Sequence, residues 1–586
     1  MAASVPAKAK DNHSIPHFAQ VLDQAGVTDD VLQWQYDGSG TDSEPYLVTW
    51  IDHDPRDPMG YTAVQRWTLT LINAGASLAV SFVSSAYTGG AKEIQQELGM
   101  GEEVFTLGVS LCVLGFALGP LLWAPLSEIY GRQILFTTTY AGLTAFNAGG
   151  AGAKNVATLL ILRFLAGAFG SSSLTNSGGV IADMFPAKQR GFAIAVFSAA
   201  PALGPIFGPI VGGFVGESIG WRWIQGIMAI FTGALWIIGS VCCPETYAPA
   251  LLRQRAKKLS KITGRVYRSE VDVQQGNTFE ETFKIALSRP LTLLLLEPIV
   301  LLLSTYHAVI YGTLYLCFGA FPIVYQEGRG WSPGVGGLAF LGVAVGTILA
   351  VLTAVWEDRR YARVSDRHDG FAPPETRLPV CMVGAVAIPI GLFWFAWTNY
   401  PSINFMVSII AGAPFGYGLS LFPPPPPTPK MSVCYIWLGI MNYLVDSYTI
   451  YAASALAANT VMRSTLGAVF PLFTSQMYAA LGIHWASSIP AFLSLACVPL
   501  PFLFYRYGPA IRARCKYAAE SNDFLEEVQN KASNDVVTEC QYVAIVELAK
   551  KVSLIASEIE ELERLHLGRN CHYKLQRSDC GESMRR

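Results

Sequence analysis

Three side chains that can carry charge lie inside stretches that are otherwise apolar: Arg163, His307 and Arg463. A charged group is costly in a hydrocarbon layer, so each must face the protein interior or water and must have a partner. An imidazole in such a place can load and release a proton. We favour a functional role over a structural pair for Arg163, whereas for His307 a satisfied hydrogen bond is favoured over a proton relay.

Further polar residues accompany these positions. Tyr311 lies four residues after His307 and shares its helix face, and Tyr306 flanks that face. Asn459 and Arg463 follow on a later helix, where Arg463 suits an anionic partner or neutralises a carboxylate of the other half of the chain. The predicted proton-coupling or substrate-contacting residues are Arg163, Glu297, Tyr306, His307, Tyr311, Asn459 and Arg463. Glu297 lies near the end of its span, and a structural role fits it as well as a role in proton coupling does.

The elements that position these residues are apolar helices. The chain has 586 residues, of which 52% are hydrophobic and 14% are charged, and its mean hydropathy is +0.35. An ordinary soluble protein has about 25% charged residues. About twelve stretches are long enough, at 1.5 Å per residue, to cross a hydrocarbon core of about 30 Å. The predicted fold is an all-α membrane protein with transmembrane helices near residues 67–88, 105–126, 134–152, 156–180, 191–215, 222–242, 294–324, 335–356, 378–397, 402–421, 438–478 (a turn and a span) and 486–506.

A charged segment in the middle of the chain separates six of these spans from six more, which suggests duplicated halves. Basic residues cluster in alternate loops, so both termini are expected to be cytoplasmic by the positive-inside rule. Residues 1–60 are polar, and no cleavable signal peptide is expected. The predicted divisions are an N-terminal arm (1–66), a six-helix bundle (67–242), a central loop (243–293), a second six-helix bundle (294–506) and a tail (507–586).

The two halves can be laid on one another. IGWRW at 219 pairs with GIHWA at 482, which matches Trp221 with Trp485, and the loop SEIYGRQ at 127 pairs with EDRRYAR at 357. Asp183 and Asp446 then fall at corresponding positions near the ends of their spans. Their matched positions favour a gate-closing role for these two carboxylates over contact with a substrate.

A run of five prolines, Pro423–Pro427, interrupts the second half. No helix passes through such a run, because each proline lacks a backbone donor and has a fixed φ. The insert, at about residues 422–437, has no counterpart in the first half. We interpret it as a non-coding segment retained in the gene sequence; the alternative is a real break in the helix that faces a cavity.

Two motifs of the first half carry unusual residue types. GPLLWAPLSEIYGRQ, at 119–133, joins two spans, and its gating residues are Leu126, Glu128, Gly131 and Arg132. Glycine permits the tight turn, and the charged pair can bind each other or nearby helix ends, which would hold the halves shut in one state and release them in another. An ordinary solvated charge pair is the alternative.

The second motif, GPIFGPIVGG, lies in the fifth span and combines closely spaced glycines with two prolines. Glycines four residues apart let helices approach closely, and prolines bend the helix. Packing alone is the alternative to a functional role. The motif residues are Gly204, Pro205, Gly208, Pro209, Gly212 and Gly213.

Taken together, these segments resemble the major facilitator superfamily, and within it the fungal drug:proton antiporters with twelve spans. The resemblance is carried by WAPLSEIYGR (123–132), Arg163 with Gly167, GPIFGPIVGG (204–213), PETYAPALLRQRAKKL (244–259) and NYLVDSYTIYAASALAANTVMRS (442–464). Gln133 departs from the family pattern, which prefers a basic residue there. The resemblance implies that the loop motif governs alternating access, that Arg163 takes part in proton coupling and that the Gly-Pro span favours export.

The expected function is therefore proton-driven export of an amphipathic organic compound such as a drug, a polyamine or a secondary metabolite, without enzymatic activity. The alternatives are a nutrient importer or uniporter, and a transporter-like receptor that carries nothing. We expect no bound cofactor, the proton gradient as energy source, a small molecule and the lipid bilayer as partners, no nucleic acid, and a plasma-membrane location. A monomer is expected, and a short heptad stripe in the tail offers dimerisation as the alternative.

Overall fold

The computed structural model describes residues 17–270, 273, 279–350, 374–420 and 436–524. The chain divides into two units, Met1–Ala518 and Ala519–Arg586, and all that follows concerns the first. The proline run Pro423–Pro427, the predicted loop partner EDRRYAR at 357 and the heptad stripe of the tail lie outside the described residues.

Long helices of the first half follow the six predicted spans. Their starts carry the expected caps: Thr62 and Gln65 form a capping box at α3, and the Asn155 side chain accepts the Thr158 amide at α7. A shorter helix, α4, connects the first two. The helices are α3 (Ala63–Ala86), α4 (Ala91–Leu98), α5 (Glu102–Tyr130), α6 (Arg132–Ala151), α7 (Val156–Met184), α8 (Ala187–Ile219) and α9 (Trp221–Cys242).

The helices of the second half are interrupted more often than those of the first half. As predicted, the stretch 438–478 contains a turn, which lies at Thr449–Tyr451. The predicted span 335–356 is described as far as residue 350. The helices are α12 (Phe279–Leu296), α13 (Pro298–Phe321), a π-helical turn (Pro322–Glu327), α14 (Pro333–Gly337), α16 (Leu378–Thr398), α17 (Phe405–Ser420), α18 (Ile436–Ser447), α19 (Ala452–Val469), α20 (Thr474–Cys497) and α21 (Pro499–Arg512).

Within the described residues, nine helical stretches are long and apolar enough to cross a membrane. The last of them, Thr449–Arg512, contains a turn at Gly482, where φ is 72° and ψ is 165°. Gly220 has nearly the same conformation, with φ 93° and ψ 159°, between α8 and α9. The two segments that the sequence pairs, IGWRW and GIHWA, thus each contain a glycine of nearly the same conformation. Trp221 directly follows its glycine and is buried, whereas Trp485 lies three residues after Gly482 and is 58% exposed; their pairing stays a prediction.

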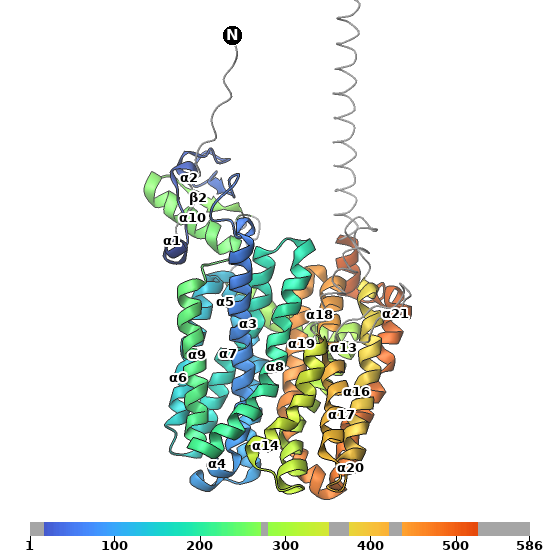
Figure 1. The fold of residues 1–586 in the computed structure, drawn as a ribbon. Coiled ribbons are helices and arrows are strands. Elements are labelled where there is room, and N and C mark those ends of the chain that lie inside the picture. Colours follow the sequence, from blue (N-terminus) through green and yellow to red (C-terminus); the bar gives the residue numbers. More distant parts are fainter. Residues whose placement is uncertain (1–16, 271–272, 274–278, 351–373, 421–435, 525–586) are drawn as a thin grey trace, which may run out of the picture. The chain divides into compact units, whose positions relative to one another are not determined.

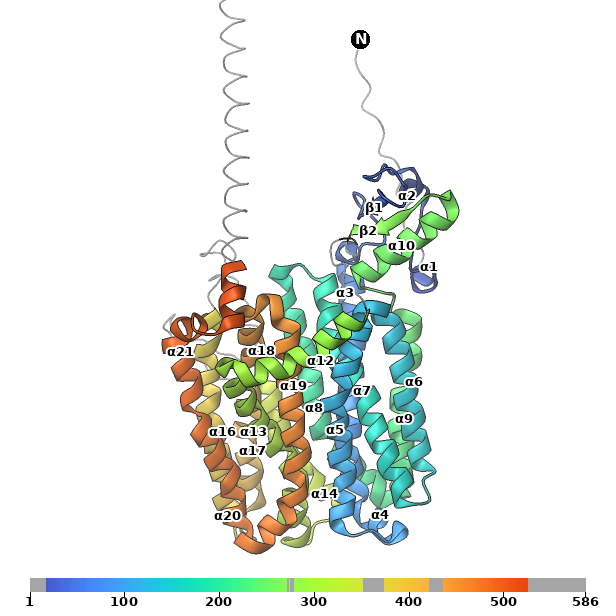
Figure 2. The same cartoon turned by 180° about the vertical axis from the view of Figure 1, so that it is seen from behind.

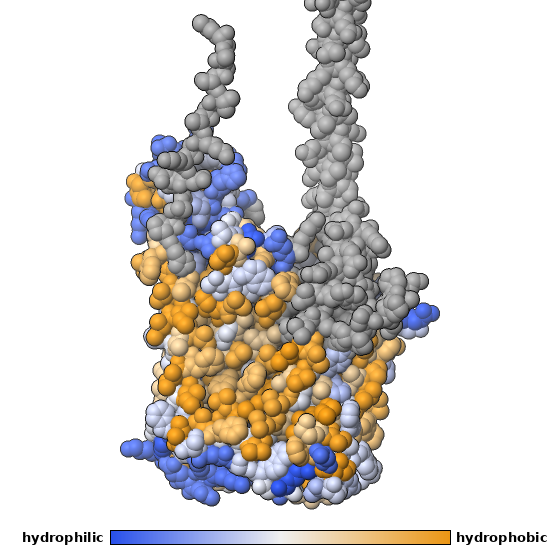
Figure 3. All heavy atoms as spheres, in the orientation of Figure 1, coloured by the Kyte–Doolittle hydropathy of each residue, from blue (hydrophilic) through white to orange (hydrophobic). Residues whose placement is uncertain are grey.

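The helices of each half pack on one another, with α3 on α8, α5 on α7 and α6 on α9 in the first half, and α13 on α19 and α16 on α17 in the second. The halves meet where α5 contacts α19 and α8 contacts α14. Figure 2 shows α12 lying crosswise over the helices, and it contacts both α5 and α19. On the face shown in Figure 3, apolar residues cover the middle of the helices and hydrophilic residues lie beyond them, as a bilayer requires. We call the two ends the α10 end and the α4 end.

The N-terminal arm and the central loop, which the sequence presents as separate segments, fold together at the α10 end (Figure 1). Strand β1 (Tyr46–Val48) pairs in parallel with β2 (Tyr267–Ser269), and α10 (Ala248–Thr263) packs against both. The arm adds α1 (His17–Leu22), α2 (Asp29–Gln33) and a short 3₁₀ helix (Pro58–Gly60). We call this assembly, residues 17–60 with 248–269, the arm–loop module.

Candidate functional site

The loop between α5 and α6 is held by a carboxylate from the end of α9. Glu245 is fully buried and accepts hydrogen bonds from the backbone amides of Arg132 (2.9 Å) and Gln133 (3.0 Å). It also accepts the amides of Thr246 and Tyr247, at 3.0 and 2.9 Å. The two loop amides open α6, where the helix dipole favours a negative charge. Glu245 therefore caps α6 and fixes the loop to α9.

The turn itself depends on Gly131, whose φ is +95°. A Cβ atom there would lie 2.2 Å from Glu245 Oε2. Positive φ is strained for residues with a side chain, and this one would also displace the capping carboxylate. The glycine predicted for the turn is thus required by both the backbone conformation and its neighbour.

The side chain of Arg132 points toward α7. Its Nε lies 3.6 Å from Asp183 Oδ2, and its Nη1 donates to Ser127 Oγ at 2.5 Å. The guanidinium also lies 4.8 Å from the centre of the Tyr247 ring. Burial raises the pKa of Tyr247 to about 12, and the face of its ring attracts the guanidinium by a cation–π contact. Arg132 thus pairs with Asp183, a residue that the sequence analysis gives as a gate carboxylate but not as a partner of this arginine.

The remaining residues of the α5–α6 motif differ from Gly131 and Arg132 in burial and in partners. Glu128 is exposed and Leu126 is partly buried. Gln133, the residue that departs from the family pattern, accepts Gln24 Nε2 at 2.7 Å and donates to the Val21 carbonyl at 3.1 Å. The loop therefore has one exposed carboxylate and a neutral residue bound to the N-terminal arm.

Arg163 is buried in α7 and is held by backbone carbonyls. Its guanidinium donates to Gly108 (3.2 Å), Val83 (2.7 Å) and Ser84 (2.9 Å). It also lies 4.6 Å from the centre of the Tyr87 ring. These contacts join α7 to α3 and α5, so the charge of Arg163 is solvated by three carbonyl dipoles and an aromatic face.

The glycines of the fifth-span motif bring α8 against its neighbours. Cβ atoms at Gly208 and Gly212 would lie 2.7 and 2.1 Å from the backbone of Ala86 in α3. Gly213 faces α14 in the same way, since a Cβ would lie 2.6 Å from the Pro333 carbonyl oxygen. Although three prolines lie inside it, α8 is continuous. The motif thus packs α8 within its half and against the other half at the same time.

The known proteins that this chain resembles agree with this architecture. The profile of the Major Facilitator Superfamily matches residues 74–428. The "MFS-type efflux pump MFS2" of Trichophyton rubrum is 57% identical over 568 residues, which cover 97% of this chain and 92% of that protein. The "Major facilitator superfamily multidrug transporter mdrA" of Aspergillus fumigatus is 60% identical over 515 residues, covering 88% of this chain and 82% of that protein.

The chain belongs to the major facilitator superfamily. A solved structure of the proton:xylose symporter XylE, bound to 6-bromo-6-deoxy-D-glucose, matches it with a TM-score of 0.53 and 16% identity. That match covers 76% of this chain and 96% of XylE. At this identity the likeness shows the fold, which is that of a multi-pass membrane protein built from two helical halves.

In this superfamily member, the candidates of the second half form one buried cluster. His307 Nδ1 lies 2.8 Å from Asn459 Oδ1, which joins α13 to α19. Arg463 lies 4.9 Å from the centre of the Tyr311 ring. Tyr306 lies on another face of α13, near Cys381 of α16 and Cys497 of α20. The structure therefore brings together four of the predicted residues and separates Tyr306 from them; their roles stay predictions.

The cluster continues into the other half of the chain. Tyr311 donates to Tyr315 Oη at 3.4 Å, and Tyr315 Oη lies 2.8 Å from Ser84 Oγ in α3. The carbonyl of Ser84 is one of those that bind Arg163. A path of direct contacts thus runs from Arg463 through two tyrosines to Ser84 and Arg163.

Two further candidates lie away from this path, at the α10 end. Glu297 precedes α13, is 1% exposed, and accepts the Tyr448 hydroxyl and the Tyr517 amide, both at 2.9 Å. The backbone of Asp446 lies in the last turn of α18, and its side chain is outside the described part of the chain. Glu297 is therefore separated from His307, with which the sequence groups it.

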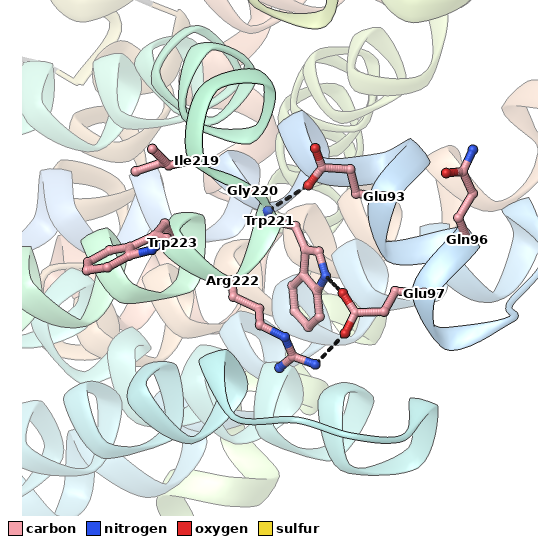
Figure 4. A pocket seen from close by; sticks show the side chains of 8 residues that line it. All are labelled: Glu93, Gln96, Glu97, Ile219, Gly220, Trp221, Arg222 and Trp223. Carbon is pink, nitrogen blue, oxygen red and sulfur yellow. Dashed lines mark hydrogen bonds and ion pairs between the residues drawn. The ribbon is translucent and has the colours of Figure 1, made fainter.

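A shallow pocket of about 590 Å³ lies at the α4 end between α4 and the α8–α9 turn (Figure 4). Its polar groups bind one another: Glu93 accepts the Trp221 amide (2.7 Å), and Glu97 accepts Trp221 Nε1 and Arg222 Nη2, both at 2.6 Å. Arg222 also donates to the Ala151 carbonyl at 2.7 Å. Because these groups already have partners, we assign the pocket to the packing of α4 on α9.

Sequence reasoning missed Glu245 as a site residue, although the PETYAP segment that contains it carries part of the family resemblance. The available signal was its position, because an acidic residue follows the last span of the first half at the end that also carries the basic loop. Its partners could not be found in this way, since Glu245 and Arg132 are 113 positions apart.

Proposed function

We propose that this protein is a proton-driven exporter of amphipathic organic compounds that works by alternating access of its two halves. The observation that carries the proposal is family membership together with near full-length identity to proteins named efflux pump and multidrug transporter. The buried path of contacts from Arg463 to Arg163 supports it, because buried polar and ionisable groups within a membrane protein are typical of proton pathways and this path joins the two halves.

We further propose that the α10 end is cytoplasmic and that the protein lies in the plasma membrane. Basic residues of α10 and of the α5–α6 loop are at that end, which the positive-inside rule assigns to the cytoplasm. At the α4 end, Glu103 accepts Gln476 Nε2 at 2.7 Å and Glu102 accepts the Ser475 hydroxyl, which joins the two halves. Contact between the halves at the outer end is the arrangement that suits loading of a substrate from the cytoplasm.

The test is transport by the full chain in reconstituted vesicles with an imposed pH gradient, using a fluorescent amphipathic cation as the probe. Movement of the probe against its gradient, coupled to proton movement in the opposite direction, is expected, and a protonophore should abolish it. Downhill flux that ignores the pH gradient would identify a uniporter. Probe binding without flux would identify a receptor, and either result would overturn the proposal.

Arg163 is the residue on which proton coupling is proposed to depend. In Arg163→Ala, three carbonyl acceptors lose their donor and the polar path loses its charge, so we expect transport to fall at least tenfold, a change of about 1.4 kcal/mol. Arg163→Lys keeps the charge but cannot reach three carbonyls at once, and we expect partial activity. Normal expression of Arg163→Ala with an undiminished transport rate would contradict this role.

A further inference from the structure

The arm–loop module has a hydrophobic core of its own. Val31, Tyr36 and Val48 from the arm are buried against Leu252 and Leu259 of α10. Burial raises the pKa of Tyr36 to about 12. Its hydroxyl donates to the Val31 carbonyl at 3.3 Å. Two segments far apart in sequence thus form one folded unit. Such a unit can hold a neighbouring loop in one position.

A buried ion pair sets the orientation of this body. Both side chains of Arg255 and Asp54 are 1% exposed, and they make two hydrogen bonds, of 2.5 and 3.0 Å. Arg255 Nε also donates to the Ala25 carbonyl at 3.1 Å. Buried pairs contribute little net stability, but the two-point geometry allows one arrangement of α10 on the arm.

The module contacts the α5–α6 loop on both sides of its turn. Gln133, after the turn, binds Gln24 and the Val21 carbonyl. Before the turn, the Ile129 carbonyl accepts Arg253 Nη1 at 2.9 Å. Arg56 is fully buried and donates to the Glu245 carbonyl at 3.2 Å, and so reaches the residue whose carboxylate caps α6.

We propose that the arm–loop module is a positioning element for alternating access, in which Gln133 and Arg56 hold the α5–α6 loop rigidly on the first half. The loop carries an exposed Glu128, which is available to meet the second half when the halves rock. A loop that moved independently would reach that contact less often. The module acts on the rate of the conformational step, and substrate binding is left unchanged.

This inference rests on the proposed transport function, so its test has two separate readouts on the full-length chain. The first is hydrogen–deuterium exchange at the amides of Arg132 and Gln133, which needs no transport. The second is vesicle transport resolved into KM and Vmax. The variants are Gln133→Leu, Gln24→Leu, their double mutant and Arg56→Met.

We expect Gln133→Leu to speed exchange at these amides and to lower Vmax about fivefold, with KM unchanged, since a net hydrogen bond contributes about 1 kcal/mol. The loss in the double mutant with Gln24→Leu should be smaller than the sum of the two single losses, because both variants remove the bond between Gln24 and Gln133; Gln133 also loses its bond to the Val21 carbonyl, and Gln24 its bond from Gln254. Lys258→Met is the control: it breaks the module's 2.6 Å pair with Asp23, whose side chains are 40% and 45% exposed and do not touch the loop. It should change neither readout.

Unchanged exchange in Gln133→Leu and Arg56→Met would overturn the positioning role. Faster exchange with an unchanged Vmax would show that the loop position does not limit transport, and would also overturn the proposal. If the wild-type chain carries no probe, the proposed function fails, and the exchange data alone then decide whether the module positions the loop.

Discussion

Two buried glutamates at the α10 end, Glu245 and Glu297, show how the same group is used differently in the two halves. Glu245 follows the last helix of the first half and accepts four backbone amides. Glu297 precedes the first helix of the second half and accepts one amide and one tyrosine hydroxyl. The first carboxylate caps a helix start, whereas the second ties α13 to side-chain and backbone groups of later segments.

The difference between Glu245 and Glu297 indicates which carboxylate is held rigidly by the fold. A carboxylate that accepts several backbone amides is held in one position, because each bond directs an oxygen to a different fixed backbone group. Glu245 is thus suited to a permanent structural role beneath the gating loop. Glu297 has fewer bonds, and one of them comes from a side chain that can rotate away, so its contacts can change during a transport cycle.

The largest effect is expected for Glu245→Ala. Four backbone amides, that of Thr246 buried and the other three partly buried, would lose their acceptor, and we expect destabilisation of about 3–5 kcal/mol. The measurement is the apparent Tm of the purified protein in detergent. Asp42→Ala, at an exposed position of the arm, is the control and should leave Tm unchanged. A change no greater than that of the control would contradict the capping role.

A smaller loss is expected for Gly131→Ala, which forces a positive φ on alanine and presses its Cβ on Glu245. The backbone strain alone costs about 1–3 kcal/mol. Gly482→Ala is a matched control, because Gly482 has nearly the same conformation (φ 72°, ψ 165°) and a Cβ atom added there would meet nothing within 4 Å. Gly131→Ala should lower Tm more than Gly482→Ala, and this excess should shrink when Glu245 is also replaced by alanine. Equal losses in the two glycine variants would refute the contact.

Replacing Glu297 tests the other side of the comparison. Glu297→Ala leaves the buried Tyr448 hydroxyl and the partly buried Tyr517 amide without their acceptor, and we expect a cost of about 2–3 kcal/mol, read as apparent Tm. Glu297→Gln keeps one acceptor oxygen and removes the charge. If Glu297 is structural, this variant retains proton-coupled transport with an unshifted pH profile in vesicles. Loss of coupling at near-normal Tm would instead assign the transported proton to Glu297.

The smallest effect is expected for Tyr448→Phe, which removes the hydroxyl that donates to Glu297 at 2.9 Å. One net hydrogen bond to a charged group contributes about 1.5–3 kcal/mol, and the lower value applies because the Tyr517 amide remains. Apparent Tm is the measurement. Tyr505→Phe, on the exposed face of α21, should show no loss. A Tyr448→Phe protein as stable as the Tyr505→Phe control would show that the bond is not formed.

Much of the fold could be predicted, because apolar stretches of the right length identify membrane helices by themselves. The predicted spans 156–180 and 222–242 lie within α7 and α9, and the turn within 438–478 is present. The association of the arm with the central loop could not be predicted. It depends on pairs such as Arg255 with Asp54, which are 201 positions apart and have no signal in local periodicity.

The sequence by itself determined the two helical halves and the residue types of the α5–α6 loop, since helix length, glycine turns and charge placement are local properties. It also named Arg163, His307, Asn459 and Arg463. Only the tertiary structure decided the partners: three carbonyls for Arg163, Asn459 for His307, and Glu245 for the start of α6. The physical reason is that a buried polar group binds whatever the packing of distant segments brings within reach.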